Sequence, residues 1–464
     1  MRPGRRILAN FFNLSAGELV ARLVNFAAFA HLARVLGSTT FGRIGFVMTI
    51  VTYLAIPVLQ GFDSVAIRDA ARDRSLLARY AANILAIRLV ATLAVWGALA
   101  AVVRLAAPEP PLGPLLLGFS LTLFATAASV KWAFQAVENT RPVAVAGIFS
   151  QLGFAAGALT IARPDQLLRI PLFLLAGEMA GALVLAFWFS RSFGALVPAF
   201  DFTLWKRLFR HSAPLLASTV LGALLFNFDV LALAVFQPAG AVGLYTAVYK
   251  LVVVFFTPLT LLQVSMLPTL SRACTLHSGV AATAEPALRY LVAAFAPLPF
   301  LGLLISPRLL EFLFGAEYAA GSLALQILLF ALPLMAQRSL FRIILVSYNL
   351  QHLDLRTVAA GTATNVFLDL LLVPRFSIVG AAVSTLCSEF VILGLSHHFV
   401  WRDVEKVFLL GQWVRPLMGV AVTMPVAWSL RAAPLALLLA VSAAVYLAAL
   451  AFLRVISWKE IASR

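Results

Sequence analysis

Long apolar runs alternate with short polar or charged connections along nearly the whole chain. A helix that crosses the hydrocarbon core of a bilayer needs about 20 mostly apolar residues, and the runs are of this length. Proline, glycine and clusters of charge mark their ends. The pattern predicts fourteen membrane-spanning helices, near residues 8–35, 42–63, 81–105, 114–136, 143–162, 170–190, 212–236, 242–267, 288–306, 321–347, 357–373, 376–399, 413–430 and 434–454.

The composition agrees with a membrane protein of the all-α, polytopic class. Of the 464 residues, 62% are apolar and 12% are charged, whereas soluble domains carry roughly 45–50% apolar and about 25% charged residues. The longest connection, about 191–211, is predicted to be an amphipathic segment at the membrane surface. Because no connection can hold a folded catalytic domain, the protein is expected not to be an enzyme.

Basic residues predict the orientation in the membrane. The chain has 35 Lys and Arg against 19 Asp and Glu, an excess that would suggest nucleic acid binding in a soluble protein. With the N-terminus in the cytoplasm, 21 basic residues fall in cytoplasmic connections and 8 in external ones. This bias predicts that both termini are cytoplasmic and that the number of spans is even. No nucleic acid partner is therefore expected.

A weak internal repeat predicts two lobes. A shift of 201 residues aligns Phe41-Gly42 with Val242-Gly243 and Pro57 with Pro258. The repeat predicts six spans in residues 1–195 and six in residues 196–400, the second lobe beginning with the amphipathic segment. Residues 401–464 then add spans 13 and 14. In transporters built from such repeats, the substrate site lies at the interface between the repeats.

Several ionisable residues fall inside the predicted spans. An ion at the centre of a membrane helix costs about 2.5–3.5 kcal/mol, so such residues usually face a bundle interior or a wet cavity. A hydrated cavity is therefore expected. The basic residues are Arg22, Arg88, Lys131, Lys250, Arg338 and Arg342, and the acidic ones are Glu18, Glu178, Asp229, Asp369 and Glu389, with Asp63 at a span end.

Three blocks of short motifs are spread over the chain. The first block contains residues 36–42 and 60–63. The second contains Pro214 and residues 227–229, 242–245 and 249–250. The third contains residues 365–369, 373–375 and 380–382. In these blocks the chain resembles the Wzx-type polysaccharide flippases of the MATE-like multidrug/oligosaccharidyl-lipid/polysaccharide superfamily.

The resemblance implies a function and partners. It implies that the protein moves a polyprenyl-pyrophosphate-linked oligosaccharide from the cytoplasmic to the periplasmic leaflet of a bacterial inner membrane by alternating access. The product would feed the synthesis of a surface polysaccharide, O-antigen or exopolysaccharide, with a polymerase and a chain-length regulator as partners. Spans 13 and 14 exceed the common family size. In related lipid II flippases such a pair forms part of a groove for the lipid tail, which is one role expected for them here.

Cations in a wet cavity would suit this substrate, because a pyrophosphate and unpaired hydroxyls are costly in hydrocarbon. Arg338 and Arg342 lie four residues apart on one helix face, and their guanidinium groups suit phosphate oxygens. The alternative is that both side chains snorkel toward the cytoplasmic headgroups. Lys131 and Lys250 are further candidates for phosphate contact, and Lys250 is preferred because it lies in the second block.

The other two basic candidates have competing interpretations. Arg22 lies four residues after Glu18, so the two side chains either neutralise each other or take part in ligand binding and gating. Arg88 lies near the cytoplasmic end of span three and is expected to snorkel, which makes it the weaker candidate for substrate contact.

Asp229, deep in span seven beside Asn227, is the strongest acidic candidate. It either binds a coupling proton or sodium ion or pairs with Lys250, and pairing is slightly favoured because buried charges are usually paired. Glu178 and Glu389 are weaker candidates for ion coupling.

Asp63 and Asp369 lie near span ends and are expected to be solvated. The chain has no phosphate-binding loop of the ATPase type, so neither a cofactor nor a metal is expected. The energy for transport would then come from an ion gradient, the membrane potential or consumption of the product.

Three other functions are alternatives to that of a flippase. A MATE-type antiporter of drugs or cations would have the same fold but would favour an acidic or aromatic cavity, whereas the intramembrane charges here are balanced. A polytopic polysaccharide polymerase or ligase would need a large extracytoplasmic loop, and none is predicted. A scaffold for other membrane enzymes would leave the intramembrane ions unexplained.

Overall fold

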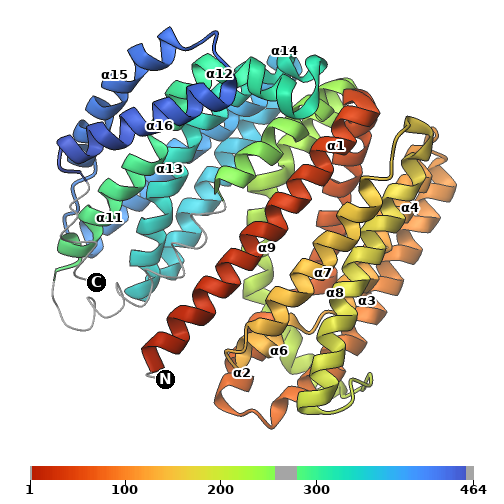
Figure 1. The fold of residues 1–464 in the computed structure, drawn as a ribbon. Helices are drawn as coiled ribbons and strands as arrows, with labels where there is room; N and C mark the ends of the chain where they lie inside the picture. The colour runs from red at the N-terminus through yellow and green to blue at the C-terminus, as the bar shows by residue number, and fades with distance from the viewer. Residues whose placement is uncertain (1–2, 257–278, 456–464) are drawn as a thin grey trace. The chain divides into compact units, whose positions relative to one another are not determined.

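The protein is all-helical in the part that the structure describes (Figure 1). The computed structural model describes the backbone of residues 3–256 and 279–455, and their side chains except those of residues 3–20 and Pro214. Within these ranges it contains helices and connections but no strand. This confirms the predicted all-α class.

Ten described segments are long and apolar enough to cross a membrane. Two of them, Ala21–Leu59 and Gln351–Asp403, each contain two predicted spans and turn at a single non-helical residue, Gly37 (φ 73°) or Ser377 (φ 51°). Glycine adopts a positive φ without strain, which suits it to the first turn. Two more helices, α7 and α15, coincide with predicted spans. Each of the fourteen predicted spans therefore falls wholly or partly on a described helix, and the protein is polytopic.

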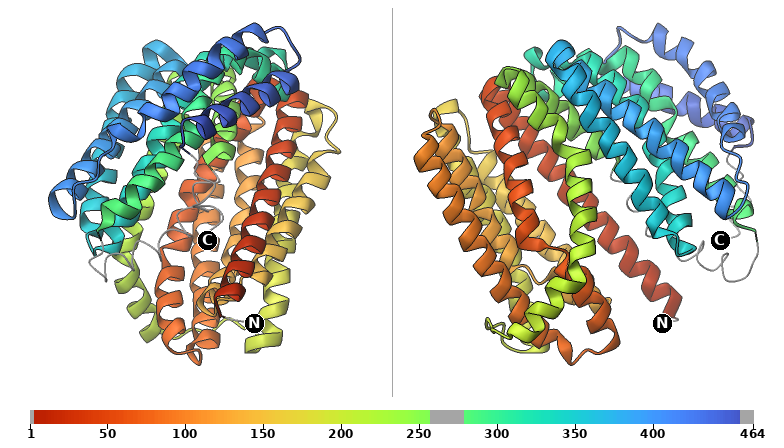
Figure 2. Two further views of the ribbon diagram at one scale, coloured as in Figure 1. Left: turned by 60° about the vertical axis from the view of Figure 1, so that its left-hand side comes forward. Right: turned by 180° about the vertical axis from the view of Figure 1, so that it is seen from behind.

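The chain divides into two compact units, Met1–Leu231 and Ala232–Arg464. The first unit contains α1 (Pro3–Leu59), α2 (Phe62–Arg72), α3 (Leu76–Ala106), α4 (Leu112–Ser120), α5 (Thr122–Ala128), α6 (Lys131–Ala136), α7 (Arg141–Ala158), η1 (Pro164–Arg169), α8 (Ile170–Phe193) and most of α9 (Phe202–Phe236). Figure 2 shows the same helices from two other sides.

The second unit begins with the end of α9 and a helix over Ala239–Phe256. It continues with α11 (Val280–Phe295), α12 (Pro297–Phe314), η2 (Ala316–Gly321), α13 (Ser322–Ser347), α14 (Gln351–Asp403), η3 (Leu410–Gln412), α15 (Val414–Ser429) and α16 (Leu435–Phe452). The last two helices, predicted as an appendage, pack onto α11, where the Tyr446 hydroxyl donates to the carbonyl of Ala293 (2.8 Å).

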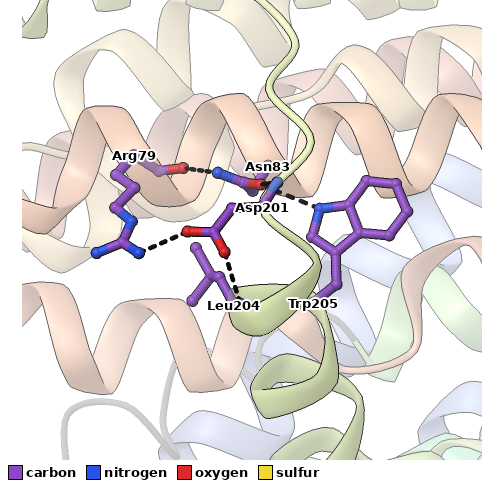
Figure 3. Close-up of polar contacts among 5 residues, drawn as sticks. All are labelled: Arg79, Asn83, Asp201, Leu204 and Trp205. Atoms are coloured by element: carbon purple, nitrogen blue, oxygen red, sulfur yellow. Dashed lines mark hydrogen bonds and ion pairs between the residues drawn. The ribbon is translucent and has the colours of Figure 1, made fainter.

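The crossover from α8 to α9 is held by the first unit (Figure 3). Asn83 Oδ1 on α3 accepts hydrogen bonds from the Asp201 amide (2.8 Å) and from Trp205 Nε1 (3.0 Å). Arg79, one turn earlier on α3, binds the Asp201 carboxylate (2.5 Å), which also caps α9 by accepting from the Leu204 amide (3.1 Å). We call these five residues the linker clamp.

A second contact fixes the start of α9 to α2. Arg207 Nη2 lies 3.4 Å from Asp69 Oδ2, which also accepts from the Tyr80 hydroxyl (2.9 Å). Leu204 and Leu208 are buried in the core of the first unit. The predicted lobe boundary at residues 195 and 196 precedes α9, whereas the units divide inside α9, because these contacts hold its beginning in the first unit. The predicted amphipathic segment is an irregular stretch followed directly by the first turns of α9.

Glycines allow α7 and α8 to approach closely. A Cβ at Gly177 would lie 2.4 Å from the Ser150 carbonyl oxygen, and one at Gly153 would lie 3.1 Å from the Gly177 Cα. The Gly-x-x-x-Gly spacings at 153–157 and 177–181 therefore serve packing, as small residues do between membrane helices.

Candidate functional site

Charged side chains inside the spans form several small groups in each of the two units. In the second unit, Arg338 on α13 meets Glu389 on α14, with Nε and Oε2 2.5 Å apart. Their side chains are 10% and 1% exposed. Because taking an unpaired ion out of water is far more costly than burying a pair, each charge requires the other. The alternative that Arg338 snorkels does not hold, since its side chain is buried against Glu389.

Arg342, one turn after Arg338, has different surroundings. Its Nε lies 3.4 Å from Asp354 Oδ2 in the first turn of α14, and its side chain is 58% exposed. Asp354 is 15% exposed, so the pair lies at the edge of the buried region, with the guanidinium group on the outer side. Arg342 therefore stays accessible to a ligand, whereas Arg338 is fully engaged with Glu389. The predicted pair on one helix face thus separates into one structural and one exposed arginine.

Arg88 in the first unit is also buried and paired. Its Nη2 lies 2.7 Å from Asp63 Oδ1, and its Nη1 donates to the Ser129 carbonyl (3.3 Å). The Arg88 side chain is 1% exposed, so the prediction that it snorkels is wrong. The side chain of Asp63 is 42% exposed, as expected for a solvated residue, but it serves as the counter-ion of Arg88.

The carbonyl that Arg88 binds lies at a break in a membrane helix. α5 ends at Ala128 and α6 begins at Lys131, with Ser129 in an extended conformation between them. A break exposes backbone groups that must be satisfied inside the membrane region. Arg88 satisfies the carbonyl group of Ser129, so this buried arginine has a second partner besides Asp63.

Lys131, the first residue of α6, is exposed and interacts electrostatically with Glu178 on α8. Glu178 is half-buried and accepts a hydrogen bond from Ser150 Oγ on α7 (3.2 Å). The structure thus brings together a predicted phosphate contact and a predicted coupling carboxylate. Gln151, the next residue of α7 after Ser150, accepts a hydrogen bond from Asn25 Nδ2 of α1 (2.5 Å). Sequence reasoning did not single out this polar pair.

Arg22 lies on α1 with a half-buried side chain that has interactions of its own. The side chain of Glu18 lies outside the described residues, so the pairing of Glu18 with Arg22 stays a prediction.

Asp229 is buried on α9, with a side chain that is 2% exposed. Tyr53 of α1, near enough for electrostatic interaction with Asp229, donates its hydroxyl to the Ala223 carbonyl (3.2 Å). Asn227 donates to the same carbonyl (3.1 Å). Lys250 is half-buried in the second unit, where Tyr245 and Tyr249 stack with their ring centroids 6.0 Å apart. The pairing of Asp229 with Lys250 stays a prediction.

Asn365 and Asp369 lie one turn apart on α14, and both are 0% exposed. The prediction that Asp369 is solvated is therefore wrong, because the helix continues past Pro374 and buries it. Neither polar atom of the Asn365 amide has a hydrogen-bond partner among the described residues. The signal in the sequence was an Asn and an Asp spaced i, i+4 in an apolar run. No group of three metal-binding side chains occurs among the described residues.

Comparisons with known proteins identify the family. Residues 7–274 match the family described as "Polysaccharide biosynthesis protein". An uncharacterised membrane protein of Methanocaldococcus jannaschii is 26% identical over 143 residues, which are 31% of this chain and 28% of that protein. The aligned stretch thus spans less than a third of that relative.

Two solved structures have a similar fold. The lipid II flippase MurJ in an inward closed conformation superposes with a TM-score of 0.76 at 13% identity, covering 95% of this chain and 98% of that one. An inward-facing multidrug resistance MATE family transporter of the MOP superfamily superposes with a TM-score of 0.64 at 13% identity, covering 86% and 94%. This multi-pass membrane protein therefore belongs to the polysaccharide biosynthesis protein family and has the fold of a MurJ- or MATE-like transporter.

Proposed function

We propose that the protein is a flippase that moves a polyprenyl-pyrophosphate-linked oligosaccharide from the cytoplasmic to the periplasmic leaflet of the inner membrane by alternating access. The product would serve surface polysaccharide synthesis, and a polymerase and a chain-length regulator are the partners that such a product requires. Membership of the polysaccharide biosynthesis family and the MurJ-like fold support this proposal.

The observation that carries the proposal is an exposed cation within a membrane helix, Arg342. Its guanidinium group is 58% exposed and lies 3.4 Å from the Asp354 carboxylate, which leaves donors for a phosphate. In the predicted topology, Arg342 lies toward the cytoplasmic end of its span. An anionic headgroup would enter the protein at this end. Lys131 in the first unit lies toward the same end of its own span and is exposed as well.

The membrane potential supplies a driving force for such a substrate. Moving an anion out of a negative cell interior releases about 2.3 kcal/mol per charge per 100 mV. A pyrophosphate with two charges is therefore driven outward without ATP, which agrees with the lack of an ATPase motif in the sequence.

A coupling ion would add to this driving force, and we place it at Asp229. A carboxylate buried in a membrane helix is costly as an ion, so it would hold a proton or a sodium ion in one state of the cycle. Glu178 is the second candidate, because Ser150 and Lys131 orient and stabilise its carboxylate.

The test is flipping by the full-length protein in proteoliposomes, with a fluorescent polyprenyl-pyrophosphate oligosaccharide as the substrate. We expect Arg342→Gln and Lys131→Gln each to lower the initial rate at least tenfold. Arg104→Gln, which removes an exposed cation from the far end of α3, is the matched control. Imposing an inside-negative potential should raise the wild-type rate.

Two results would refute the proposal. The first is wild-type flipping that is absent under all gradients while an organic cation is exported, which would favour the antiporter. The second is equal rates in Arg342→Gln, Lys131→Gln and Arg104→Gln, which would remove both residues from the headgroup path. Asp229→Asn should abolish the response to a proton or sodium gradient and leave the response to the potential intact.

A further inference from the structure

A pocket of about 420 Å³ lies in the second unit, where the end of α14 meets the connection to α15. This volume is within the range of small-ligand sites. The residues that line it are mainly apolar and aromatic: His397, Trp401, Phe408, Leu409, Leu410 and Gly411. None of them belongs to the charged groups described above.

Aromatic contacts hold the walls of this pocket. The rings of Trp401 and Phe408 meet edge to face with centroids 5.2 Å apart, and the His397 ring lies 5.6 Å from Trp401. His397 Nε2 also lies 3.0 Å from the Val407 carbonyl oxygen. These contacts fasten the connection to the last turns of α14.

The connection is also fastened to α11. The Glu405 carboxylate accepts hydrogen bonds from the amides of Val280 and Ala281. In return, the Glu285 carboxylate accepts from the Phe408 amide (3.0 Å). A pocket held on two sides in this way is largely pre-formed, so a ligand would not have to order it.

Among the described residues that adjoin the pocket, Lys406 is a cation without a carboxylate partner. Arg402 and Asp403 neutralise each other through two contacts of 2.8 Å. The charge of Glu405 is stabilised by the N-terminal amides of α11. Lys406 lies over the Trp401 ring, 5.9 Å from its centroid, and no carboxylate among the described residues pairs with it.

Two apolar side chains that line the pocket, in the connection between α14 and α15, are exposed. Phe408 is 59% exposed and Leu410 is 80% exposed. Tryptophan and lysine together are typical of the interface between hydrocarbon and headgroups. The pocket is therefore placed to receive an apolar chain from the bilayer while Lys406 meets the headgroup layer.

We propose that this pocket binds an anionic membrane phospholipid, with part of an acyl chain among Trp401, Phe408 and Leu410 and the phosphodiester on Lys406. One uncompensated lysine matches a headgroup with a single negative charge. A pyrophosphate carrier would need several fixed cations or guanidinium groups. The site is thus distinct from the proposed headgroup contacts and does not depend on the flippase function.

The test is lipid retention by the full-length protein, measured by native mass spectrometry after delipidation and titration with phosphatidylglycerol or phosphatidylcholine. We expect wild type to prefer phosphatidylglycerol about fivefold, the effect of one lysine near an anionic lipid. Lys406→Gln should remove this preference. Arg415→Gln removes another exposed cation of the same region, one that has no contact with the Trp401 ring, and should keep the preference.

A second pair of variants tests the apolar part of the site. Gly411 lines the pocket and a Cβ there meets no atom within 4 Å, so the backbone has room to carry the larger side chain of Gly411→Phe. Gly394 on α14 is equally open but does not line the pocket. We expect Gly411→Phe, but not Gly394→Phe, to lower phosphatidylglycerol retention at least threefold.

Quenching by brominated phosphatidylglycerol locates the bound chain. Tryptophan fluorescence should be quenched more by this lipid than by brominated phosphatidylcholine, and the difference should be lost in Trp401→Phe. Equal retention of both lipids by wild type would overturn the proposal. Unchanged preference in Lys406→Gln would overturn it too, as would displacement of phosphatidylglycerol by a polyprenyl pyrophosphate at equal concentration.

Discussion

Arg338 and Glu389 form a buried ion pair that joins α13 to α14, with Nε and Oε2 2.5 Å apart. Arg338 and Arg342 lie one turn apart on α13, but only Arg338 belongs to this buried pair. Arg338 links two helices, while the side chain of Arg342 is 58% exposed.

Replacing one member of this pair should destabilise the protein severely. Glu389→Gln leaves the Arg338 guanidinium buried without a counter-ion, and breaking a buried pair in this way costs about 3–5 kcal/mol. We expect a large fall in the apparent Tm of the detergent-solubilised protein. The double variant Arg338→Met/Glu389→Leu should recover most of the loss. A single variant as stable as wild type would mean that the pair does not form.

A methyl group at Gly177 should separate α7 from α8. A Cβ there would lie 2.4 Å from the Ser150 carbonyl oxygen and 2.8 Å from the Phe154 amide nitrogen. Overpacking of this kind costs about 1–3 kcal/mol, so Gly177→Ala should lower the apparent Tm. The control is Gly147→Ala on α7, where an added Cβ meets nothing within 4 Å. If Gly177→Ala and Gly147→Ala have the same apparent Tm, the close approach of α7 and α8 is refuted.

Acid should loosen the attachment of α9 to the first unit. The hydrogen bond from Arg79 and the amide of Leu204 hold the pKa of Asp201 below its ordinary value. Burial raises the pKa of Asp69, but hydrogen bonds from Tyr80 and Arg68 outweigh it and hold this pKa below its ordinary value as well.

The sign of the effect follows from these lowered values. A carboxylate whose pKa is lower in the folded state stabilises that state above its unfolded pKa, and the contribution is lost as the pH falls through the folded value. We therefore expect the amides of Ala199 and Asp201 to lose protection from hydrogen exchange below about pH 4. Protection is measured as the ratio of the intrinsic exchange rate to the observed rate at the same pH. Arg79→Gln should shift this onset to higher pH, and an onset unchanged by the substitution would contradict the linker clamp.

Removing the Asn365 amide should not destabilise the fold. A buried amide without hydrogen-bond partners is itself destabilising, and replacing it by an apolar group of similar shape is nearly neutral or stabilising. We expect Asn365→Leu to keep or raise the apparent Tm, whereas transport falls if this amide serves the substrate or a coupling ion. A fall of the apparent Tm by several degrees would show that the amide has partners in the folded protein.

The sequence was sufficient to predict the helices, because the thickness of a bilayer imposes the length of every apolar run. The break between α5 and α6 escaped prediction, since neither Ser129 nor Val130 is a residue that normally ends a helix. The closely spaced glycines of α7 and α8 are a signal that the sequence does carry, because their i, i+4 spacing places them on one helix face.

The partners of the buried ions could not be predicted. Helix periodicity places Arg338 and Arg342 on one face, but it does not say which neighbouring helix each one meets. Glu389 lies 51 residues beyond Arg338 and is separated from it by half of α14. Arg88 was expected to snorkel because it lies near the end of span three, and its counter-ion, Asp63, lies 25 residues earlier in another helix. Such pairings arise only from the packing of the helices.

The first turns of α9 (Phe202–Phe236) are fixed to the first unit by the linker clamp and by Arg207, and Pro214 follows them in the same helix. Proline removes a backbone hydrogen bond from the interior of a helix and kinks it. Residues inserted at 194–200, ahead of Asp201, would therefore lengthen the crossover without disturbing the start of α9. Each residue inserted between Trp205 and Pro214 would instead turn the rest of the helix by about 100° relative to the clamped turn.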